Sequence, residues 1–305
     1  MQPAASTFAF LLLLILIGRV MAWRNLLPER AADTLNLVVL YVNLPATVLL
    51  YASRLEPSRS LLSVASLPWL QLVVAAMLVL GLSRAFRWPR AVEGALLLTV
   101  PLGNTSYLGY PLTRALLGDP ALPFAVAYDQ FGSFLILSTY GVVIIALYGH
   151  GVHPRPWHIL RRVLTFPAFL ALLVALAIAP VQLPRDLTAM LQPLATALLP
   201  MVALAIGLQL RLRIDRAQVP ALGAGLALKL LALPALALLL MPLLGLHGPA
   251  AHAALLESAM APMITAAALA SMAGLAPRLA AAMVGYGVVL LAPLLLVLTG
   301  LGLLR

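Results

Sequence analysis

A polar break, Pro101-Leu102-Gly103-Asn104-Thr105-Ser106-Tyr107-Leu108-Gly109-Tyr110-Pro111, interrupts a hydrophobic segment of the chain. A continuous helix is disfavoured here because proline lacks a backbone donor and clashes with the preceding turn. Lipid offers no water to the freed backbone groups, so such a break persists in a membrane only where it faces protein or a wet cavity. The stretch therefore predicts a binding site on an interrupted helix, a feature typical of secondary transporters.

The composition indicates a polytopic membrane protein. Of 305 residues, 63% are hydrophobic and only 9% are charged, and the mean hydropathy is +1.06. A soluble domain would carry about 25% charged residues. The net charge of +10 comes from arginines scattered in short loops without interleaved aromatic residues, so it indicates membrane topology, and we expect no nucleic-acid partner.

The reactive side chains predict neither a metal site nor a catalytic centre. The chain has no cysteine, which excludes disulfides and thiolate ligands. Its five histidines lack the spacing of a metal-binding motif, and no serine has a histidine in plausible register for a nucleophilic triad. We therefore expect no cofactor and no enzymatic activity.

Apolar segments of about 20 residues, the length that spans a bilayer, recur along the chain. Clusters of Arg, Pro and Gly divide them into about ten predicted transmembrane helices, so we expect an all-α fold. The helices are 6–23, 34–53, 61–83, 92–117, 121–148, 160–180, 187–210, 217–243, 250–273 and 277–303.

The basic residues predict the orientation, because cytoplasmic loops are enriched in Lys and Arg. Twelve arginines lie in one set of loops and five in the opposite set, while Arg19 and Lys229 lie inside spans. We expect the first set to be cytoplasmic, which places both termini outside and the central loop inside. The histidines of that loop are His150, His153 and His158.

Ten helices divide into two halves of five, residues 1–150 and 151–305. An odd number of helices in each half gives the halves opposite topology. Leu44-Pro45 recurs as Leu199-Pro200 at an offset of 155, and at an offset of 156 Asn104-Thr105-Ser106 aligns with Met260-Ala261-Pro262. The pattern predicts an inverted repeat whose fourth and ninth helices are broken and cross near the middle of the membrane.

Four segments resemble the auxin efflux carrier family, and its bacterial branch in particular. They are Asn104-Thr105-Ser106-Tyr107-Leu108-Gly109-Tyr110-Pro111, Asn43-Leu44-Pro45-Ala46, Tyr128-Asp129-Gln130-Phe131-Gly132-Ser133-Phe134 and Glu257-Ser258-Ala259-Met260-Ala261-Pro262. The resemblance implies a ten-helix transporter of the inner membrane, usually dimeric and related in fold to bile acid/sodium symporters. Its helices four and nine would cross at prolines, and it would move small organic anions such as auxin, malate or malonate.

Two departures from the plant carriers of that family limit what the resemblance implies. Gly103 stands where the plant carriers have a proline directly before the Asn-Thr pair. The large cytoplasmic loop of many plant members is also absent between the two halves. Auxin itself is therefore not implied as the substrate.

The polar residues of the first break are the leading candidates for binding the substrate. The amide of Asn104 can donate to a carboxylate without the cost of a buried positive charge. The half-helix that restarts beside it offers unpaired N–H groups and a positive dipole end, which favour an anion. Thr105 and Ser106 add hydroxyl donors. Alternatively, all three residues cap the broken helix ends.

Prolines and glycines mark the predicted hinges. We expect Gly103, Gly109 and Pro111 to shape the first break and Pro262 to form the second, with Pro262 also contacting the substrate. Pro262 is alternatively an ordinary transmembrane kink.

Two further polar residues are predicted to contact the substrate. Thr265 begins the half-helix that follows the second break. Asn43 precedes the Leu44-Pro45 kink of the second helix, either on the cavity wall or bonded to a freed backbone carbonyl.

Three ionisable residues lie inside predicted spans, where charges are costly and usually face a cavity or a partner. Asp129 and Glu257 are candidates for coupling protons to transport. Lys229 is a candidate charge partner, because it would neutralise either carboxylate in a structural pair.

The residues favour a permease or exporter of small carboxylates that works by alternating access at the crossing. A sodium- or proton-coupled symporter or antiporter of the bile-acid-symporter type is the alternative. It would need carboxylates at the crossing itself, where the chain has Asn-Thr-Ser and Met-Ala-Pro instead. A membrane-embedded receptor or enzyme is the third alternative, and no paired nucleophile and base supports an enzyme.

Overall fold

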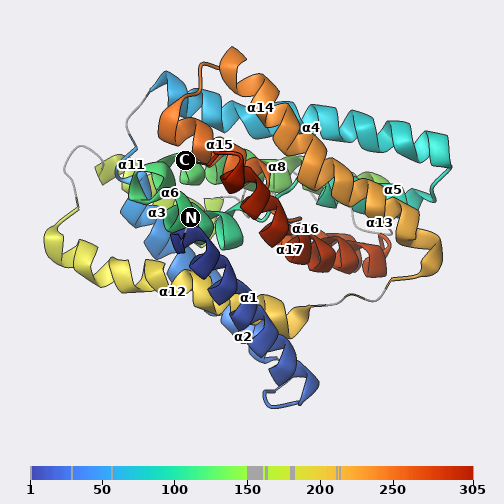
Figure 1. Cartoon of the computed structure of the whole chain (residues 1–305), viewed down its shortest axis with the longest axis horizontal. Helices are drawn as coiled ribbons and strands as arrows, with labels where there is room; N and C mark the ends of the chain where they lie inside the picture. The colour runs from blue at the N-terminus through green and yellow to red at the C-terminus, as the bar shows by residue number, and fades with distance from the viewer. Residues whose placement is uncertain are drawn as a thin grey trace.

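The computed structural model of the chain describes residues 2–28, 30–55, 58–149, 161, 164–178, 183–210, 212 and 214–304. In these residues the structure is all-helical apart from one isolated bridge between two segments (Figure 1). Six continuous helices are long and apolar enough to cross a membrane. They are Ala31–Ala52, Arg59–Phe86, Asp119–Tyr148, Arg185–Gln209, Arg216–Leu243 and Pro277–Gly300.

Two further segments are broken halfway, as the sequence predicts for the fourth and ninth helices. The fourth consists of α5 (Arg90–Thr99), a π-helical turn η2 (Thr105–Gly109) and α6 (Tyr110–Leu117). The ninth consists of α15 (Gly248–Ser258) and α16 (Ile264–Met272). With 10 and 11 residues, α5 and α15 are each about 15 Å long, half of a hydrocarbon core of about 30 Å. Together with α1 and α11, the described part of the chain confirms the polytopic all-α fold.

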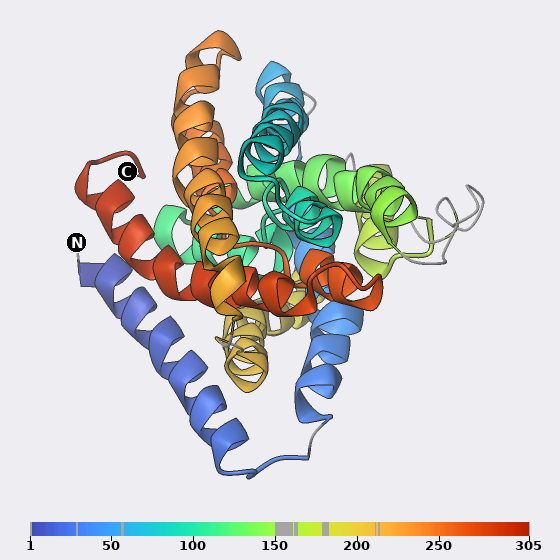
Figure 2. The same cartoon turned by 90° about the vertical axis from the view of Figure 1, so that its right-hand side faces the viewer.

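The helices pack into two bundles. The smaller bundle joins the first, second, sixth and seventh segments, with α12 packed along α1 and α2 and α11 packed on α3. Its helices are α1 (Gln2–Trp23), α2 (Ala31–Val38), α3 (Leu44–Ala52), α11 (Pro167–Ile178) and α12 (Arg185–Gln209), with the π-helical turn η1 (Val39–Asn43) between α2 and α3. Figures 1 and 2 show α1 and α2 extending beyond the other helices at the loop that joins them.

The larger bundle contains the remaining segments and both breaks. The long helix α4 packs on both α5 and α15, α17 packs on α5 and α14 packs on α15, with α4 beside α14 along one edge (Figure 1). Besides the broken segments, its helices are α4 (Arg59–Phe86), α7 (Leu122–Tyr128), α8 (Phe134–Ile136), α9 (Val142–Tyr148), α13 (Val219–Ala227), α14 (Leu233–Leu243) and α17 (Pro277–Gly300). Short turns connect them: η3 (Asp119–Ala121), η4 (Asp129–Ser133), η5 (Leu137–Gly141), η7 (Arg216–Gln218) and η8 (Leu228–Ala232).

Wide π-helical turns coincide with the polar residues that the sequence singles out. The turn η1 ends at Asn43, η2 begins at Thr105, η4 begins at Asp129, and η8 contains Lys229. A π turn leaves one backbone group per turn without its helical partner and is frequent at functional sites. These turns place polar side chains inside an apolar bundle.

The division of the chain at residues 150/151 falls outside the described residues, as do His150, His153 and His158, so the inverted repeat with its two halves stays a prediction. The beginning of α1 and the end of α17 lie close together in both views (Figures 1 and 2). An even number of membrane crossings would place both of these helix ends on the same side of the membrane. Which side of the membrane they occupy also stays a prediction.

Candidate functional site

The two breaks cross and are hydrogen-bonded to each other. Gly103 and Pro262 form an isolated antiparallel bridge. On one side of it the N–H of Asn104 donates to the carbonyl of Ala261 at 2.8 Å, and on the other the N–H of Met263 donates to the carbonyl of Leu102 at 2.9 Å. Backbone groups freed by one broken helix are therefore satisfied by the other, which is how an interrupted helix remains stable away from water.

The residue types at the bridge follow from its geometry. Both flanking hydrogen bonds belong to neighbouring residues, so Gly103 and Pro262 face each other as a non-hydrogen-bonded pair, and proline loses nothing by lacking an N–H. The Pro262 ring packs on α17, where a Cβ added to Gly287 would lie 2.4 Å from the proline Cδ. Pro262 therefore forms the second break, as predicted, and it lies outside the cavity described below.

Lys229 approaches the crossing from the eighth segment and is buried. A Cβ added to Gly103 would lie 3.0 Å from its Nζ. Its ammonium donates to the carbonyl of Ser258 at 3.4 Å, at the C-terminal end of α15 where a cation is favourable. Within the described residues Lys229 forms no ion pair with Asp129 or Glu257. Its hydrogen bond therefore goes to a helix end, while Glu257 is the carboxylate within electrostatic reach of its ammonium.

Asp129 is fully buried beside the first break and accepts hydrogen bonds from four side chains. Its Oδ1 accepts from the hydroxyls of Thr105 and, at 2.8 Å, Ser106. Its Oδ2 accepts from Tyr110 at 2.7 Å and from Gln130 Nε2 at 2.8 Å. The carboxylate thus holds the start of the half-helix η2–α6 onto the fifth segment.

Thr105 and Ser106 therefore neither cap a helix nor present free hydroxyls, since both donate to Asp129. Sequence reasoning missed Tyr110 and Gln130, although both lie in segments that carry the family resemblance. For Tyr110 a signal was available in the spacing. Tyr110 follows Ser106 by four residues, which places both side chains on one face of a helix.

Glu257 is fully buried on α15 and packs against the first break. Its Oε1 accepts from the Thr113 hydroxyl at 3.1 Å, while its Oε2 is buried without a hydrogen-bond partner. A Cβ added to Gly109 would lie 2.1 Å from that Oε2, so only glycine fits at this position. Pro111 lies two residues after the π-helical turn η2, inside the continuous half-helix η2–α6.

A cavity of about 320 Å³ lies beside the crossing and is lined by residues of both broken helices. Asn104 is 3% exposed, and its Nδ2 is buried without a hydrogen-bond partner. The Asn104 side chain makes no capping hydrogen bond, which removes the capping interpretation for this residue. The polar or aromatic members of the lining are Tyr41, Asn104, Ser106, Tyr107, Asp129, Phe134, Ser138, Thr165, Phe166 and Thr265.

The second half-helix also points its N-terminal end toward this cavity. Met263 and Thr265, which flank the first residue of α16, both line it. The first N–H groups of a helix have no intrahelical acceptor. The N-terminal end of α16 and the residue Asn104, whose amide donor is unpaired, therefore border one cavity.

Asn43 lies elsewhere. Its Nδ2 donates to the carbonyl of Leu194 in α12 at 2.8 Å, and its carbonyl accepts from the Thr47 hydroxyl at 2.8 Å. It is absent from the lining of the 320 Å³ cavity. Of the two interpretations open to the sequence, a hydrogen bond to backbone is the one observed, and Asn43 joins η1 to α12 within the smaller bundle.

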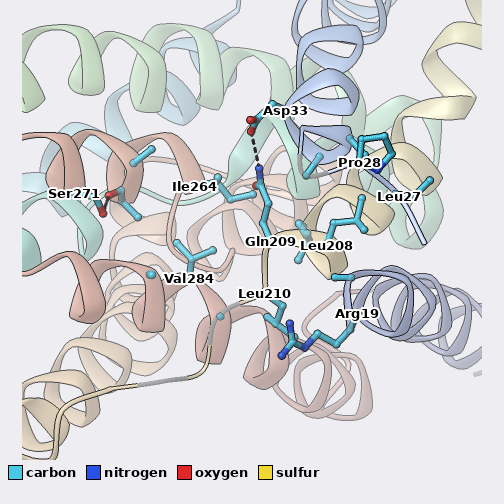
Figure 3. A pocket seen from close by; sticks show the side chains of 18 of the residues that line it. Arg19, Leu27, Pro28, Asp33, Leu208, Gln209, Leu210, Ile264, Ser271 and Val284 are labelled. Atoms are coloured by element: carbon cyan, nitrogen blue, oxygen red, sulfur yellow. Dashed lines mark hydrogen bonds between the residues drawn. The ribbon is translucent and has the colours of Figure 1, made fainter. Parts of the chain in front are cut away.

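A larger cavity of about 760 Å³ lies between the two bundles (Figure 3). Its walls are the end of α1, the start of α2 and the end of α12 on one side and α16 and α17 on the other. Ile264, at the start of α16, lines it, so the two cavities approach each other at the N-terminal end of that half-helix. Both lie on the side of the crossing where the sequence predicts the cytoplasm.

Comparisons with known proteins agree with this architecture. An uncharacterized transporter of Methanocaldococcus jannaschii is 28% identical over 212 residues, which cover 65% of this chain and just under two thirds of the relative (66%). An uncharacterized transporter of Methanothermobacter thermautotrophicus is 26% identical over 274 residues, 88% of each chain. Both relatives are archaeal, so the bacterial branch stays a prediction. The profile of the family described as Membrane transport protein matches residues 3–299, and the chain therefore belongs to this family of integral membrane transporters, the auxin efflux carrier family that its four motifs resemble.

Proposed function

We propose that this membrane transporter moves small organic anions, such as carboxylates, by alternating access at the crossing. The observation that supports the proposal is Asn104, which lines a cavity of about 320 Å³ and whose buried Nδ2 lacks a hydrogen-bond partner. A buried unpaired donor costs about 1–3 kcal/mol, so a ligand that accepts from it is favoured by a similar amount. A carboxylate oxygen is such an acceptor.

The surroundings of Asn104 support an anion over a cation. The N-terminal end of α16 faces the same cavity through Met263 and Thr265, and a helix N-terminus stabilises negative charge. Asp129, whose carboxylate also borders the cavity, accepts four hydrogen bonds from protein side chains. Those donors compensate its charge, so the carboxylate does not make the site a cation site.

The coupling ion is the point on which the alternative, a proton- or sodium-coupled carrier, depends. One observation favours proton coupling: Glu257 Oε2 is buried beside the crossing without a partner. Asp129 is the weaker candidate because both of its oxygens already accept hydrogen bonds. We propose that, if the carrier is coupled, Glu257 carries the proton and Asp129 positions the first break.

The two bundles suggest how access alternates. The larger bundle contains both breaks, while the smaller bundle contacts it across the cavities. Movement of the larger bundle against the smaller one would expose the crossing to either side in turn. Both cavities lie toward the edge with more arginines, which the sequence places in the cytoplasm. We further propose a homodimer in a bacterial inner membrane, two inverted five-helix halves, and a fold shared with bile acid/sodium symporters.

Uptake by reconstituted protein tests the proposal. Purified protein in liposomes is given labelled malonate, malate or a cation as a control, with and without a membrane potential. We expect uptake of an anion that is lost in Asn104→Ala. Replacing sodium and imposing a pH jump in the same vesicles separates uncoupled, sodium-coupled and proton-coupled transport. Uptake of cations alone would refute the proposal.

A further inference from the structure

Arg19 is a cation inside the first membrane segment and lines the 760 Å³ cavity between the bundles. Its side chain is exposed, and among the described residues no acidic group lies within ion-pair distance of it. No hydrogen bond from its guanidinium to any of these residues is present either. Figure 3 shows Arg19 reaching toward Leu210 at the end of α12. An unpaired guanidinium in a cavity is a ready partner for an anion.

Close helix packing fixes the position of Arg19. A Cβ added to Gly18 would lie 2.6 Å from the carbonyl oxygen of Leu204. A Cβ added to Gly207 would lie 2.2 Å from the carbonyl oxygen of Ile15 and 3.0 Å from the nitrogen of Arg19. The backbones of α1 and α12 therefore touch immediately beside Arg19. Its backbone is held rigidly, so little backbone entropy is lost when its side chain binds a ligand.

The one carboxylate in the cavity lining is already engaged. Asp33 Oδ1 accepts from Gln209 Nε2 at 3.3 Å, and Gln209 Oε1 accepts from Asn36 Nδ2 at 3.3 Å. Figure 3 shows the Asp33–Gln209 pair separated from Arg19. These bonds keep Asp33 away from Arg19 and leave the guanidinium to an outside ligand.

The two cavities lie against the same turn of α16. Ile264 borders the larger cavity, while Met263 and Thr265 border the smaller one, which Asn104 also lines. An anion that crossed this turn would move from Arg19 toward Asn104. Arginines of the neighbouring loops add a positive field at this edge, which raises the local concentration of anions.

We propose that Arg19 forms an entrance site that binds the carboxylate of the transported anion before it reaches the crossing. This inference rests on the proposed function and adds a second, separate anion contact to it. The guanidinium and a carboxylate oxygen pair by hydrogen bonds, without any covalent step. Because the Arg19 side chain is exposed, we expect the affinity of the site to be modest and to depend on ionic strength.

Steady-state uptake of labelled malonate, offered from the side of the cavity, tests the entrance site. We expect Arg19→Gln to raise KM about three- to tenfold with little change in the maximal rate. Arg24→Gln is the matched control, because Arg24 follows the same helix α1 and does not line the cavity. Its guanidinium instead stacks on the ring of Trp23, 5.2 Å from the ring centroid. We expect it to keep the KM of the unmodified protein.

The absence of cysteine from the sequence allows a sharper test. Arg19→Cys is treated with an aminoethyl methanethiosulfonate, which restores a positive charge, or with the sulfonatoethyl reagent, which adds a negative one. The first reagent should restore a low KM and the second should raise it further, while Arg24→Cys responds to neither. Equal effects of both reagents would mean that bulk matters and charge does not, which would overturn the proposal.

Two more measurements separate the remaining outcomes. If Arg19 binds a lipid phosphate, the effect of Arg19→Gln disappears in liposomes of a neutral glycolipid that contains no phosphate, and the entrance site for substrate is refuted. The malonate-induced rise in Tm in detergent is read beside uptake. If malonate raises Tm less in Arg19→Gln than in the unmodified protein, but raises it normally in Asn104→Ala, the entrance site is upheld and the crossing site is refuted. The reverse result would refute the entrance site alone.

Discussion

Replacing Asn104 by alanine should separate binding from stability, because the amide nitrogen of the side chain makes no hydrogen bond in the empty protein. Its backbone N–H donates to Ala261, and its carbonyl accepts from the N–H groups of Leu108 and Gly109 at 3.1 Å. All of these bonds survive in Asn104→Ala. The Nδ2 that is removed is buried and unpaired, and no capping bond is lost.

The magnitudes follow from that geometry. Deleting an unpaired buried donor removes a desolvation cost of about 1–3 kcal/mol and leaves a small void of comparable cost, so we expect the unfolding free energy to change by less than about 1 kcal/mol. A hydrogen bond to a charged ligand contributes about 1.5–3 kcal/mol, which corresponds to a loss of roughly 10- to 150-fold in affinity for malonate. Thermal melting in detergent and radioligand binding measure the two quantities on the same preparation.

Asn43→Ala is the control with the opposite signature. Its amide donates to the carbonyl of Leu194 at 2.8 Å, so its loss should lower the unfolding free energy by about 1–3 kcal/mol and leave malonate affinity unchanged. Asn104→Ala protein that binds malonate like the unmodified protein, or that melts as early as Asn43→Ala, would refute the assignment of Asn104.

Three further variants probe the packing, the coupling and the edge opposite the cavities. Gly207→Ala places a methyl group 2.2 Å from the carbonyl oxygen of Ile15, so we expect Tm to fall in line with an overpacking cost of about 1–3 kcal/mol; an unchanged Tm would contradict this. Glu257→Gln should flatten the dependence of uptake on external pH while folding is retained, and an unaltered pH profile would exclude Glu257 as the proton carrier. Arg114→Ala removes a partly exposed pair with Asp119 at 3.2 Å, worth about 0.2–1 kcal/mol. We therefore expect Arg114→Ala, which also loses the hydrogen bond to the Thr196 hydroxyl at 2.8 Å, to lower Tm only slightly; a fall as large as that of Gly207→Ala would contradict this.

The position of both breaks could be predicted from the sequence because proline and glycine act locally. Pro101, Gly103 and Pro262 disfavour helix wherever their neighbours lie, so the breaks can be located without the rest of the fold. The bridge itself could not be predicted. An offset of 156 aligned Asn104 with Met260, whereas the structure pairs Gly103 with Pro262. Repeat alignment compares equivalent positions in two halves, while contact depends on the angle at which the two segments cross.

Charge assignments were less predictable, since they depend on helix rotation. The sequence left both buried carboxylates open as the charge partner of Lys229. Its Nζ donates at the C-terminal end of α15, and Glu257 is the carboxylate with which it interacts electrostatically. Breaking the ninth helix creates that end, with a partial negative charge that a continuous helix would not have there. The break in the ninth helix therefore explains why the ammonium of Lys229 is favourable at this buried position.

The same reasoning distinguishes the two carboxylates, which look equivalent in the sequence. Asp129 begins a π-helical turn facing η2, and the donors that reach it come from the polar run of the first break and from Gln130. Glu257 lies on α15, where the facing part of η2 is Gly109, a residue with no side chain to donate. One carboxylate is thus fully compensated and the other keeps a free oxygen beside the crossing. Because a proton carrier must bind and release its proton while transport proceeds, we expect the less restrained group, Glu257, to suit that role better if transport is proton-coupled. Asp129 would then hold the first break in place.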